Sequence, residues 1–482
     1  MKRNEMKHSV KRIAAVLAVA FGTGFGTAGA AQAAEIVIVN GNAPGVGFND
    51  PTPAEPVGGN TGKTLGEQRL IAFTYAANLW GAKLESPQPI RIQASFEPLN
   101  CTANSATLGS AGTLEVFSDF PGAPKADTWY PTALANKLSG VDQSPDVPDI
   151  RARFNSRLGL ADDCLPGSPF YLGLDGNHGS ATDFVAVLLH EMGHGLGFQS
   201  FTDEETGEYL AGVPAIWDHF MTDNRTERKW TQLSEEERVA NAVSGDGLSW
   251  DGPHVNAAVP DVLGPRGVVT ISGPAAGGAA GELAFGEASF GPRITEAGVT
   301  GQVLPVVENR ATNTGLACAP LTGANAKAVR GNIALVDRGT CSFVIKAANV
   351  QAAGAIAMIV ADNQPGDPAG MSGDNPDITI PSVRISQAAG DALKAALARR
   401  SRTSSGVIAK LGADPSRLAG TDDRNRILMY TPTTFQPGSS VSHYTTAASP
   451  NQLMEPSING DLTHELEPPK DLTLPLLKDL GW

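Results

Sequence analysis

The sequence predicts an α+β protein that is interrupted by an inserted α/β domain. Apolar residues recur at helical spacing over residues 65–80, and an alternating stretch at 90–96 indicates a half-buried strand. A nearly continuous apolar helix is expected from residue 184 onward. Between 268 and 412, short β runs alternate with alanine-rich helices, which is typical of an independent α/β unit. With 482 residues, the chain has room for two or three domains.

The N-terminal elements begin with a short strand at 35–39, a Gly/Pro/Asn-rich loop to about residue 62, and the helix and strand named above. The apolar helix is expected to start near Thr182 or Asp183, because either side chain suits an N-cap. In the inserted stretch we expect strands at 333–336 and 356–360 and helices at 346–353 and 388–400. For residues 424–482, the sequence predicts loops, one apolar segment and a short terminal helix.

Composition narrows the function classes. The 54 glycines and 34 prolines favour many turns and long loops over a helical bundle. Acidic side chains outnumber basic ones, 50 to 36, for a net charge of -14. This balance argues against a nucleic-acid partner, because such a partner is held mainly by neutralising its phosphates.

The first 33 residues have the pattern of a secretory signal peptide. Five basic residues precede an apolar stretch at 13–21, and Ala31-Gln32-Ala33 fits the cleavage rule, which places the mature start near Ala34. No later segment approaches the roughly 18 apolar residues of a membrane helix. We therefore expect a secreted, extracellular protein, with the periplasm or the cell surface as alternatives.

The mature chain keeps four cysteines, which in an oxidising compartment predicts two disulfides. Order in the sequence favours Cys101 with Cys164 and Cys318 with Cys341. Because no CxxC spacing occurs, a cysteine zinc site is not expected.

The stretch HEMGH at residues 190–194 carries the clearest chemistry. On a helix, His190 and His194 lie on one face and can bind one metal ion, and Glu191 can act as a general base towards water at the open position of that ion. Gly197 then allows the chain to turn away from the helix. Ser200 stands where the contiguous motif HExxHxxGxxH would place a third histidine, so the third ligand must come from elsewhere.

Further along, GSSVSHY at 438–444 is followed by NQLMEP at 451–456. With HEMGHGLGF at 190–198, this resembles the leishmanolysin family of metzincin metallopeptidases, in which the third histidine follows a long insertion and precedes a methionine turn. The resemblance implies a zincin-like catalytic domain, with a mixed sheet and an active-site helix. It implies one catalytic Zn²⁺ held by His190, His194 and His443, with Glu191 as general base and Met454 in the methionine turn.

Other residues compete for these roles. Asp218 or His219 could complete the metal site instead of His443. Tyr430 and Tyr444 flank the segment of His443, and either could hydrogen-bond a tetrahedral intermediate or simply pack. Acidic residues between 362 and 377 could bind Ca²⁺, although solvated turns give the same pattern.

The inserted stretch has its own resemblance. GNIALVDRGTCSF at 331–343, together with Lys346, AAGA at 352–355 and IPSV at 380–383, resembles the protease-associated (PA) domain. That resemblance implies a fold but no chemistry, so the domain is expected to cover the cleft, select substrates or bind a partner. From the residues we expect an exposed ion pair of Asp337 with Arg338 and a tight helix-to-strand turn at Gly354.

These observations predict a signal peptide at 1–33 and a catalytic domain formed by 34–267 and 413–482 around a PA domain at 268–412. The predicted function is a secreted zinc endopeptidase that hydrolyses protein substrates through a zinc-bound water. The alternatives are a catalytically silent, zinc-containing adhesion or binding protein, and an amidase of cell-wall peptides. The base Glu191 argues against the silent alternative, because a structural metal site needs no base.

Overall fold

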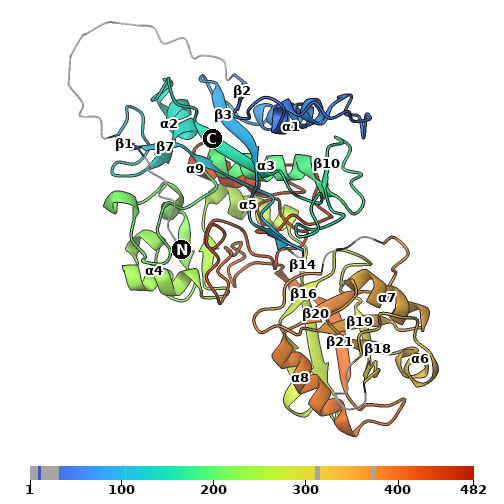
Figure 1. The fold of residues 1–482 in the computed structure, drawn as a ribbon. Coiled ribbons are helices and arrows are strands. Elements are labelled where there is room, and N and C mark those ends of the chain that lie inside the picture. The colour runs from blue at the N-terminus through green and yellow to red at the C-terminus, as the bar shows by residue number, and fades with distance from the viewer. Residues whose placement is uncertain (1–8, 12–31, 104, 310–314, 372, 374) are drawn as a thin grey trace, which may run out of the picture.

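The structure is a computed structural model, and it describes residues 9–11, 32–103, 105–309, 315–371, 373 and 375–482. Most of the signal peptide expected at 1–33 lies outside the described residues. Of the described helices, none is long and apolar enough to cross a membrane. Packing divides the described chain into a main body, residues 32–264 and 419–482, and an insert, residues 265–418 (Figure 1).

A four-stranded sheet organises the main body in the order β2-β3-β9-β6. Strands β2 (Ile36–Asn40), β3 (Ile90–Glu97) and β9 (Ile150–Asn155) run parallel, whereas β6 (Gly109–Thr113) is antiparallel to β9. Every second side chain of β3 is buried, as its alternating sequence predicts. Strand β6 lies at the edge of this sheet within the described residues.

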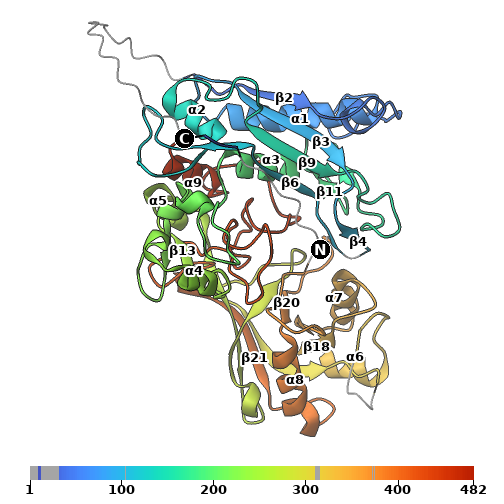
Figure 2. The ribbon, with the colours of Figure 1, turned by 60° about the vertical axis from the view of Figure 1, so that its left-hand side comes forward.

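Helices α1 (Leu65–Gly81) and α3 (Phe184–Leu196) contact each other and the same sheet, so both cover one of its faces (Figure 2). The side chain of Thr64 caps α1 by accepting the N–H of Glu67 at 3.2 Å. Helix α3 is buried along its whole length, as its apolar sequence predicts. One hydrophobic core includes residues of both helices, of the sheet and of the C-terminal stretch 427–480.

The main body contains further short elements. These are the strands β4 (Cys101–Thr102), β5 (Ser105–Ala106), β7 (Glu115–Phe117), β8 (Tyr130–Pro131), β10 (Phe170–Tyr171), β11 (Thr182–Asp183), β12 (Met221–Asp223) and β13 (Leu248–Trp250), and the helices α2 (Thr132–Ser139), α4 (Glu235–Ala242), α5 (Pro253–Val262) and α9 (Thr473–Leu480). Strand β1 (Ser9–Lys11), which precedes the main body in the chain, pairs parallel with β7. Long loops join them, as the glycine and proline content predicts.

An eight-stranded mixed sheet forms the insert, in the order β15-β14-β21-β17-β18-β19-β20-β16. Its elements are the strands β14 (Pro265–Ser272), β15 (Gly281–Leu283), β16 (Phe285–Glu287), β17 (Val299–Pro305), β18 (Ile333–Asp337), β19 (Ala357–Ala361), β20 (Ser382–Ile385) and β21 (Ile408–Leu418), and the helices α6 (Gly323–Val329), α7 (Phe343–Ala352) and α8 (Gln387–Ala396).

The central strands of the insert supply two separate cores. In β18, Ile333 and Leu335 belong to the core that includes Leu393 of α8, whereas Ala334 and Val336 belong to the core that includes Val350 of α7. This division follows from the two-residue period of a strand, which sends successive side chains to opposite faces. The sheet is therefore covered on both faces, as the alternating strands and helices of the sequence predict.

Two long strands connect the insert to the main body. β14 and β21 pair antiparallel, with Ser272 opposite Ile408 and Pro265 opposite Leu418, and they form a stalk between the two regions (Figures 1 and 2). At the base of the stalk, the N–H of Ala419 donates to the carbonyl of Gly264 at 2.9 Å. The chain thus enters and leaves the insert at neighbouring points, a geometry that allows a folded insertion without separating the flanking segments.

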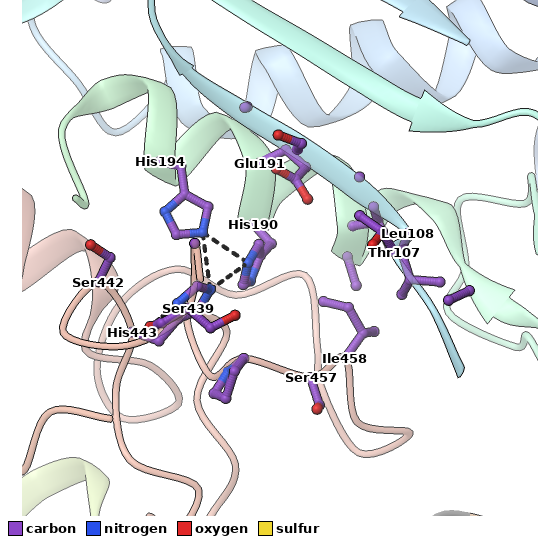
Figure 3. A pocket seen from close by; sticks show the side chains of 18 of the residues that line it. Thr107, Leu108, His190, Glu191, His194, Ser439, Ser442, His443, Ser457 and Ile458 are labelled. Atoms are coloured by element: carbon purple, nitrogen blue, oxygen red, sulfur yellow. Dashed lines mark hydrogen bonds between the residues drawn. The ribbon is translucent and has the colours of Figure 1, made fainter. Parts of the chain in front are cut away.

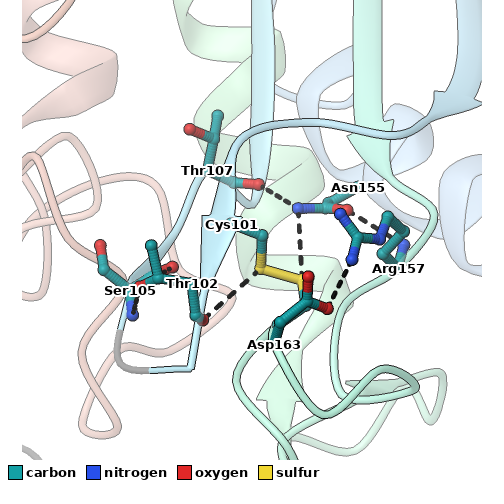
Figure 4. Close-up of a disulfide and its surroundings, with 8 residues drawn as sticks. Cys101, Thr102, Ser105, Thr107, Asn155, Arg157 and Asp163 are labelled. Carbon is teal, nitrogen blue, oxygen red and sulfur yellow. Dashed lines mark hydrogen bonds and ion pairs between the residues drawn. A yellow bond between two sulfur atoms is a disulfide. The ribbon is translucent and has the colours of Figure 1, made fainter.

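Both predicted disulfides are confirmed, and the described residues include no free cysteine. Cys101–Cys164 ties the β4–β5 hairpin to the loop at 157–165 (Figure 4). Cys318–Cys341 closes a loop within the insert. Gly354 has a φ of +91° between α7 and β19, which confirms the predicted tight turn.

One predicted contact of the insert is wrong. Arg338 donates to Asp362 at 2.8 Å, and Asp337 pairs instead with Lys394. Adjacent residues of a strand point to opposite faces, so Asp337, the last residue of β18, and Arg338 lie poorly placed to pair with each other.

Candidate metal centre

Helix α3 positions the HEMGH residues. Of the two predicted N-caps, Asp183 caps the helix, accepting the N–H groups of Val185 at 2.9 Å and Ala186 at 3.3 Å. Helix α3 ends at Leu196. Its C-cap, Gly197, has a φ of +126°, a backbone conformation that residues other than glycine rarely adopt. The chain therefore turns away directly after His194, as expected for this glycine.

Three histidine side chains converge at one point. The Nε2 atom of His194 lies 3.1 Å from Nε2 of His190 and 3.1 Å from Nε2 of His443, and the third pair is 3.3 Å apart (Figure 3). All three residues are buried. The main body thus brings together two histidines from α3 and one from a loop 249 residues beyond His194. Within the described residues, this is a group that could hold a metal ion.

The hydrogen bonds of these rings point to a cation. Each ring places its Nδ1 atom against a backbone carbonyl: His190 against Leu453 at 2.8 Å, His194 against Phe198 at 2.7 Å and His443 against Ser439 at 2.8 Å. A carbonyl only accepts, so each Nδ1 carries the proton and each Nε2 is left with a lone pair. Three lone pairs that face one another repel unless a cation lies between them. The donor set therefore fits a metal ion.

Burial also keeps the rings neutral, as metal ligands must be. It lowers the pKa of His190 to about 4 and that of His194 to about 3, the latter helped by the neighbouring His190. The pKa of His443 is lowered well below its usual value, first by burial and then by the two other rings.

Glu191 points from α3 towards strand β6. It is 6% exposed, and its Oε2 atom has no hydrogen-bond partner among the described residues. Burial raises the pKa of Glu191 to about 8, although the N–H of Ala111 and the charge of Arg153 act in the opposite direction. A Cβ atom at Gly109 would lie only 2.5 Å from Oε1 of Glu191, so this strand approaches the carboxylate closely because it has no side chain there.

Met454 lies against the same helix, fully buried, on the segment that bonds His190. A Cβ atom at Gly193 would lie 2.8 Å from its Sδ atom. Its backbone carbonyl accepts the N–H of Tyr444, at 2.9 Å, next to His443. Met454 therefore forms an apolar support between the helix of His190 and His194 and the loop of His443.

The competing candidates have other contacts. Asp218 is fully buried and accepts hydrogen bonds from the N–H of Ala215 at 2.7 Å and the hydroxyl of Ser200 at 2.8 Å. His219 contacts Thr128, with 3.1 Å between Nε2 and Oγ1. The residue that replaces the third histidine of the contiguous motif, Ser200, thus anchors a buried acid.

The two candidate tyrosines, Tyr430 and Tyr444, also make contacts away from the three histidine rings. The hydroxyl of Tyr444 donates to the carbonyl of Leu472 at 3.1 Å, and its ring packs edge-on against Phe198. Tyr430 does not line the cleft described below, but its N–H donates to the carbonyl of His443 at 2.8 Å. Both therefore support the third histidine through backbone and packing.

The predicted calcium stretch is described only in part, because residues 372 and 374 lie outside the described chain. Its first acid, Asp362, accepts from Arg338 at 2.8 Å and from Arg384 at 2.7 Å. These two guanidinium groups neutralise its charge.

A long cleft opens over the three histidines. One side consists of the β4–β5 hairpin and β6, and the other of the loops at 435–443 and 456–460, with Leu108 facing Ile458 across the site (Figure 3). Residues 199–205 line one end. Two residues of the insert, Ser289 and Gly373, also line the cleft. Sequence reasoning missed these walls, because their residues are small or polar and follow no periodic pattern.

Comparison with known families shows a PA domain in this chain. The model of the PA domain matches residues 299–393, which covers β17 to α8 of the insert. Among curated proteins, vacuolar-sorting receptor 2 of Arabidopsis thaliana is 42% identical over 73 residues, 13% of this chain and 12% of that protein. The ER degradation-enhancing alpha-mannosidase-like protein 3 of Xenopus laevis is 37% identical over 132 residues, 25% of this chain and 13% of that protein. This chain thus spans about an eighth of the length of either relative.

Solved structures give only distant likenesses. The zinc aminopeptidase BSAP of Bacillus subtilis has a TM-score of 0.22 and 21% identity, covering 33% of this chain and 36% of that one. An aminopeptidase from Aneurinibacillus sp. strain AM-1 has a TM-score of 0.22 and 16% identity, and covers 42% of each chain.

Proposed function

We propose that this protein is a secreted, zinc-dependent endopeptidase in which His190, His194 and His443 bind the ion and Glu191 is the general base. The observation that carries the proposal is the convergence of three Nε2 atoms whose rings each place Nδ1 against a carbonyl. Next to them lies a buried carboxylate with an unpartnered oxygen atom.

The spacing supports zinc. Zinc binds imidazole nitrogen at about 2.0–2.1 Å in a tetrahedron, which separates two ligand atoms by about 3.3 Å. The three Nε2 separations are 3.1, 3.1 and 3.3 Å. Three neutral imidazoles leave a fourth position open, as in catalytic rather than structural zinc sites.

When bound, zinc would polarise a water molecule and the scissile carbonyl. Glu191 would accept a proton from the attacking water and deliver it to the departing amine. Its buried position suits this exchange, because burial reduces the cost of holding a proton near neutral pH. The carbonyls of Leu453, Phe198 and Ser439 would hold the three rings in one orientation.

The cleft supports a polypeptide substrate. Strand β6 runs beside the three histidines, and its outer edge is unpaired within the described residues. An extended peptide can add to such an edge through backbone hydrogen bonds. The cleft is also lined by segments other than those that carry the three histidines, among them residues 100–102, 105–108 and 199–205, so we propose cleavage within a chain and not removal of a terminal residue.

The sequence also supports a particular family of zinc endopeptidases. A long insertion between the second and third histidines, followed by the LMEP turn, supports a leishmanolysin-like metzincin with Met454 in its methionine turn. We propose a catalytic domain of residues 34–267 and 413–482 around the domain at 268–412, after removal of a signal peptide at 1–33. The disulfides are consistent with secretion.

The test is hydrolysis of casein by the purified mature protein, with Glu191→Ala beside it at matched zinc content. Activity in the wild type that falls by at least a hundredfold in the variant, while zinc stays bound, is expected from loss of a general base, which contributes roughly 10²–10⁴-fold. Glu191→Gln, which keeps the side-chain volume, should be equally inactive. Inactivity of all three proteins with zinc bound would instead support the silent binding protein or a latent precursor.

A further inference from the structure

One arginine of the insert touches the C-terminal part of the main body. Arg293, in the loop between β16 and β17, donates from Nη1 to the hydroxyl of Ser449 at 2.7 Å. Its other terminal nitrogen, Nη2, pairs with the carboxylate of Asp461. One guanidinium of the insert therefore binds two residues of the C-terminal part of the main body.

Those two residues bracket a functional loop. The segment between Ser449 and Asp461 contains Met454, and its residues 456–460 form the cleft wall opposite β6. The side-chain amide of Asn451 donates to the second oxygen of Asp461 at 2.6 Å, which draws the two ends of the segment together. We call residues 449–461 the wall loop.

The base of the stalk holds the same loop. The carbonyl of Ser449 accepts the N–H of Gly264 at 2.8 Å, and the carbonyl of Gly264 accepts the N–H of Ala419 at 2.9 Å. The first residue of the wall loop is thus fixed by the junction of the insert through its backbone and by Arg293 through its side chain.

Arg293 is a cation beside a group of acidic side chains. Glu287 lies 3.7 Å from its Nη1 atom, Asp461 pairs with Nη2, and Glu455 lies within the wall loop. Burial raises the pKa of Glu287, and the pKa of Glu455 is raised well above its usual value; in both, the charge of Arg293 opposes the rise while that of Asp461 adds to it. Without Arg293, three carboxyl groups would lie near one another with no cation between them.

We propose that Arg293 is a positioning residue through which the insert holds the wall loop at its distance from β6, and so sets how tightly the cleft binds a peptide. The inference rests on the proposed peptidase function, but its structural half does not. It also means that the insert is not separable from the site. Deleting residues 268–412 would remove Arg293 as well, so loss of activity after that deletion would not show that the insert selects substrates.

The first test is kinetic. Arg293→Ala should raise KM three- to tenfold on a peptide long enough to span the wall loop, with kcat within twofold of the wild type and unchanged zinc content. Arg293→Lys, which keeps the charge but not the fork of two donors, should recover part of the loss. The matched control is Arg266→Ala, because Arg266 pairs with Glu282 on the stalk at 2.8 Å and its pairing does not involve the wall loop.

The second test needs no activity. Hydrogen exchange of the amides at 451–461 should be faster in Arg293→Ala than in Arg266→Ala, while the amides of α3 stay unchanged. Unchanged exchange would overturn the proposal whether or not the protein is a peptidase. Faster exchange with an unchanged KM would overturn its functional half. If the wild type hydrolyses no protein, the proposed function fails, and the exchange result still decides whether Arg293 holds the loop.

Discussion

The insert folds from one continuous stretch, whereas the main body joins two stretches that the whole insert separates. Both cores of the insert are built from residues between 269 and 411. The core of the main body takes residues from 34 to 263 and again from 427 to 480. The PA model matches residues 299–393, within the continuous unit. The match to a known family therefore lies in the region that carries none of the three clustered histidines.

The two regions also bury charge differently. In the insert, burial would raise the pKa of Asp362, but Arg338 and Arg384 hold it below its usual value. In the main body, the described groups that donate hydrogen bonds to Asp218 are all neutral, and burial raises its pKa to about 6. A paired charge stabilises the insert, whereas the acid near the metal centre is held by hydroxyl and amide groups.

Replacing His443 tests whether the distant stretch completes the metal centre. His443→Ala leaves two ligands on α3, so we expect zinc to be lost on dialysis and casein hydrolysis to fall by roughly a thousandfold, about 4 kcal/mol in the activation free energy. The unfolding transition of the insert should not move, because its cores contain no residue of this loop. His254→Ala is the control for loss of a histidine, since that side chain is 56% exposed and its Nδ1 contacts Asp479 at 2.9 Å and not the three clustered histidines. Retention of one zinc per chain with full activity would mean that another residue is the third ligand.

The pH dependence of stability should separate the two buried acids. The folded-state pKa of Asp218, about 6, lies above its unfolded value, so the folded protein binds more protons between about pH 4 and 6. Its contribution to the free energy of unfolding therefore falls as pH rises through that window, by roughly 2–3 kcal/mol for about two pKa units. Asp218→Asn keeps a side-chain oxygen for Ala215 and an amide that can donate to Ser200, and should lack this fall.

The control for that measurement has the opposite sign. Asp362 has a lowered pKa, so its contribution is present above the usual carboxyl pKa and is lost as pH falls through the lowered value. Asp362→Asn should therefore destabilise the protein more at pH 7 than at acid pH. Chemical unfolding between pH 4 and 7 gives the comparison for Asp218, and the same measurement extended below pH 4 gives the comparison for Asp362. Parallel pH curves for the wild type and Asp218→Asn would show that Asp218 titrates normally in the folded protein.

Sequence alone predicts what depends on local periodicity. The four-residue spacing of His190 and His194, an N-cap at Thr182 or Asp183 and the alternation of β3 all act within one element, and the structure has each of them, with Asp183 as the cap. The disulfide pairing also follows from order in the chain. The helix and strand features need only neighbours within one element, and the disulfides need only that four cysteines pair in chain order.

What sequence does not predict depends on contacts between distant segments. Strand β6 reads Gly-Ser-Ala-Gly-Thr, which has neither alternation nor strong β-propensity, yet it forms a wall of the cleft because β9 pairs with it. Arg293 lies 156 residues from Ser449, and no local pattern marks that pair. The same limit explains why Arg338 was expected to pair with its neighbour Asp337 instead of Asp362.

Gly109 offers a finer test of the main body, because a change there should affect Glu191 without affecting the three histidines. An added methyl group would approach Oε1 of Glu191 to 2.5 Å and displace the carboxylate, so Gly109→Ala should lower kcat by about tenfold, or about 1.4 kcal/mol, with zinc fully bound. Gly112→Ala, on the same strand, meets Gln199 at 3.2 Å and should have little effect. In a Glu191→Ala background, Gly109→Ala should cause no further loss, since the group that it displaces is gone. An additive loss in the double variant would mean that Gly109→Ala acts through strand β6 itself and not through the carboxylate of Glu191.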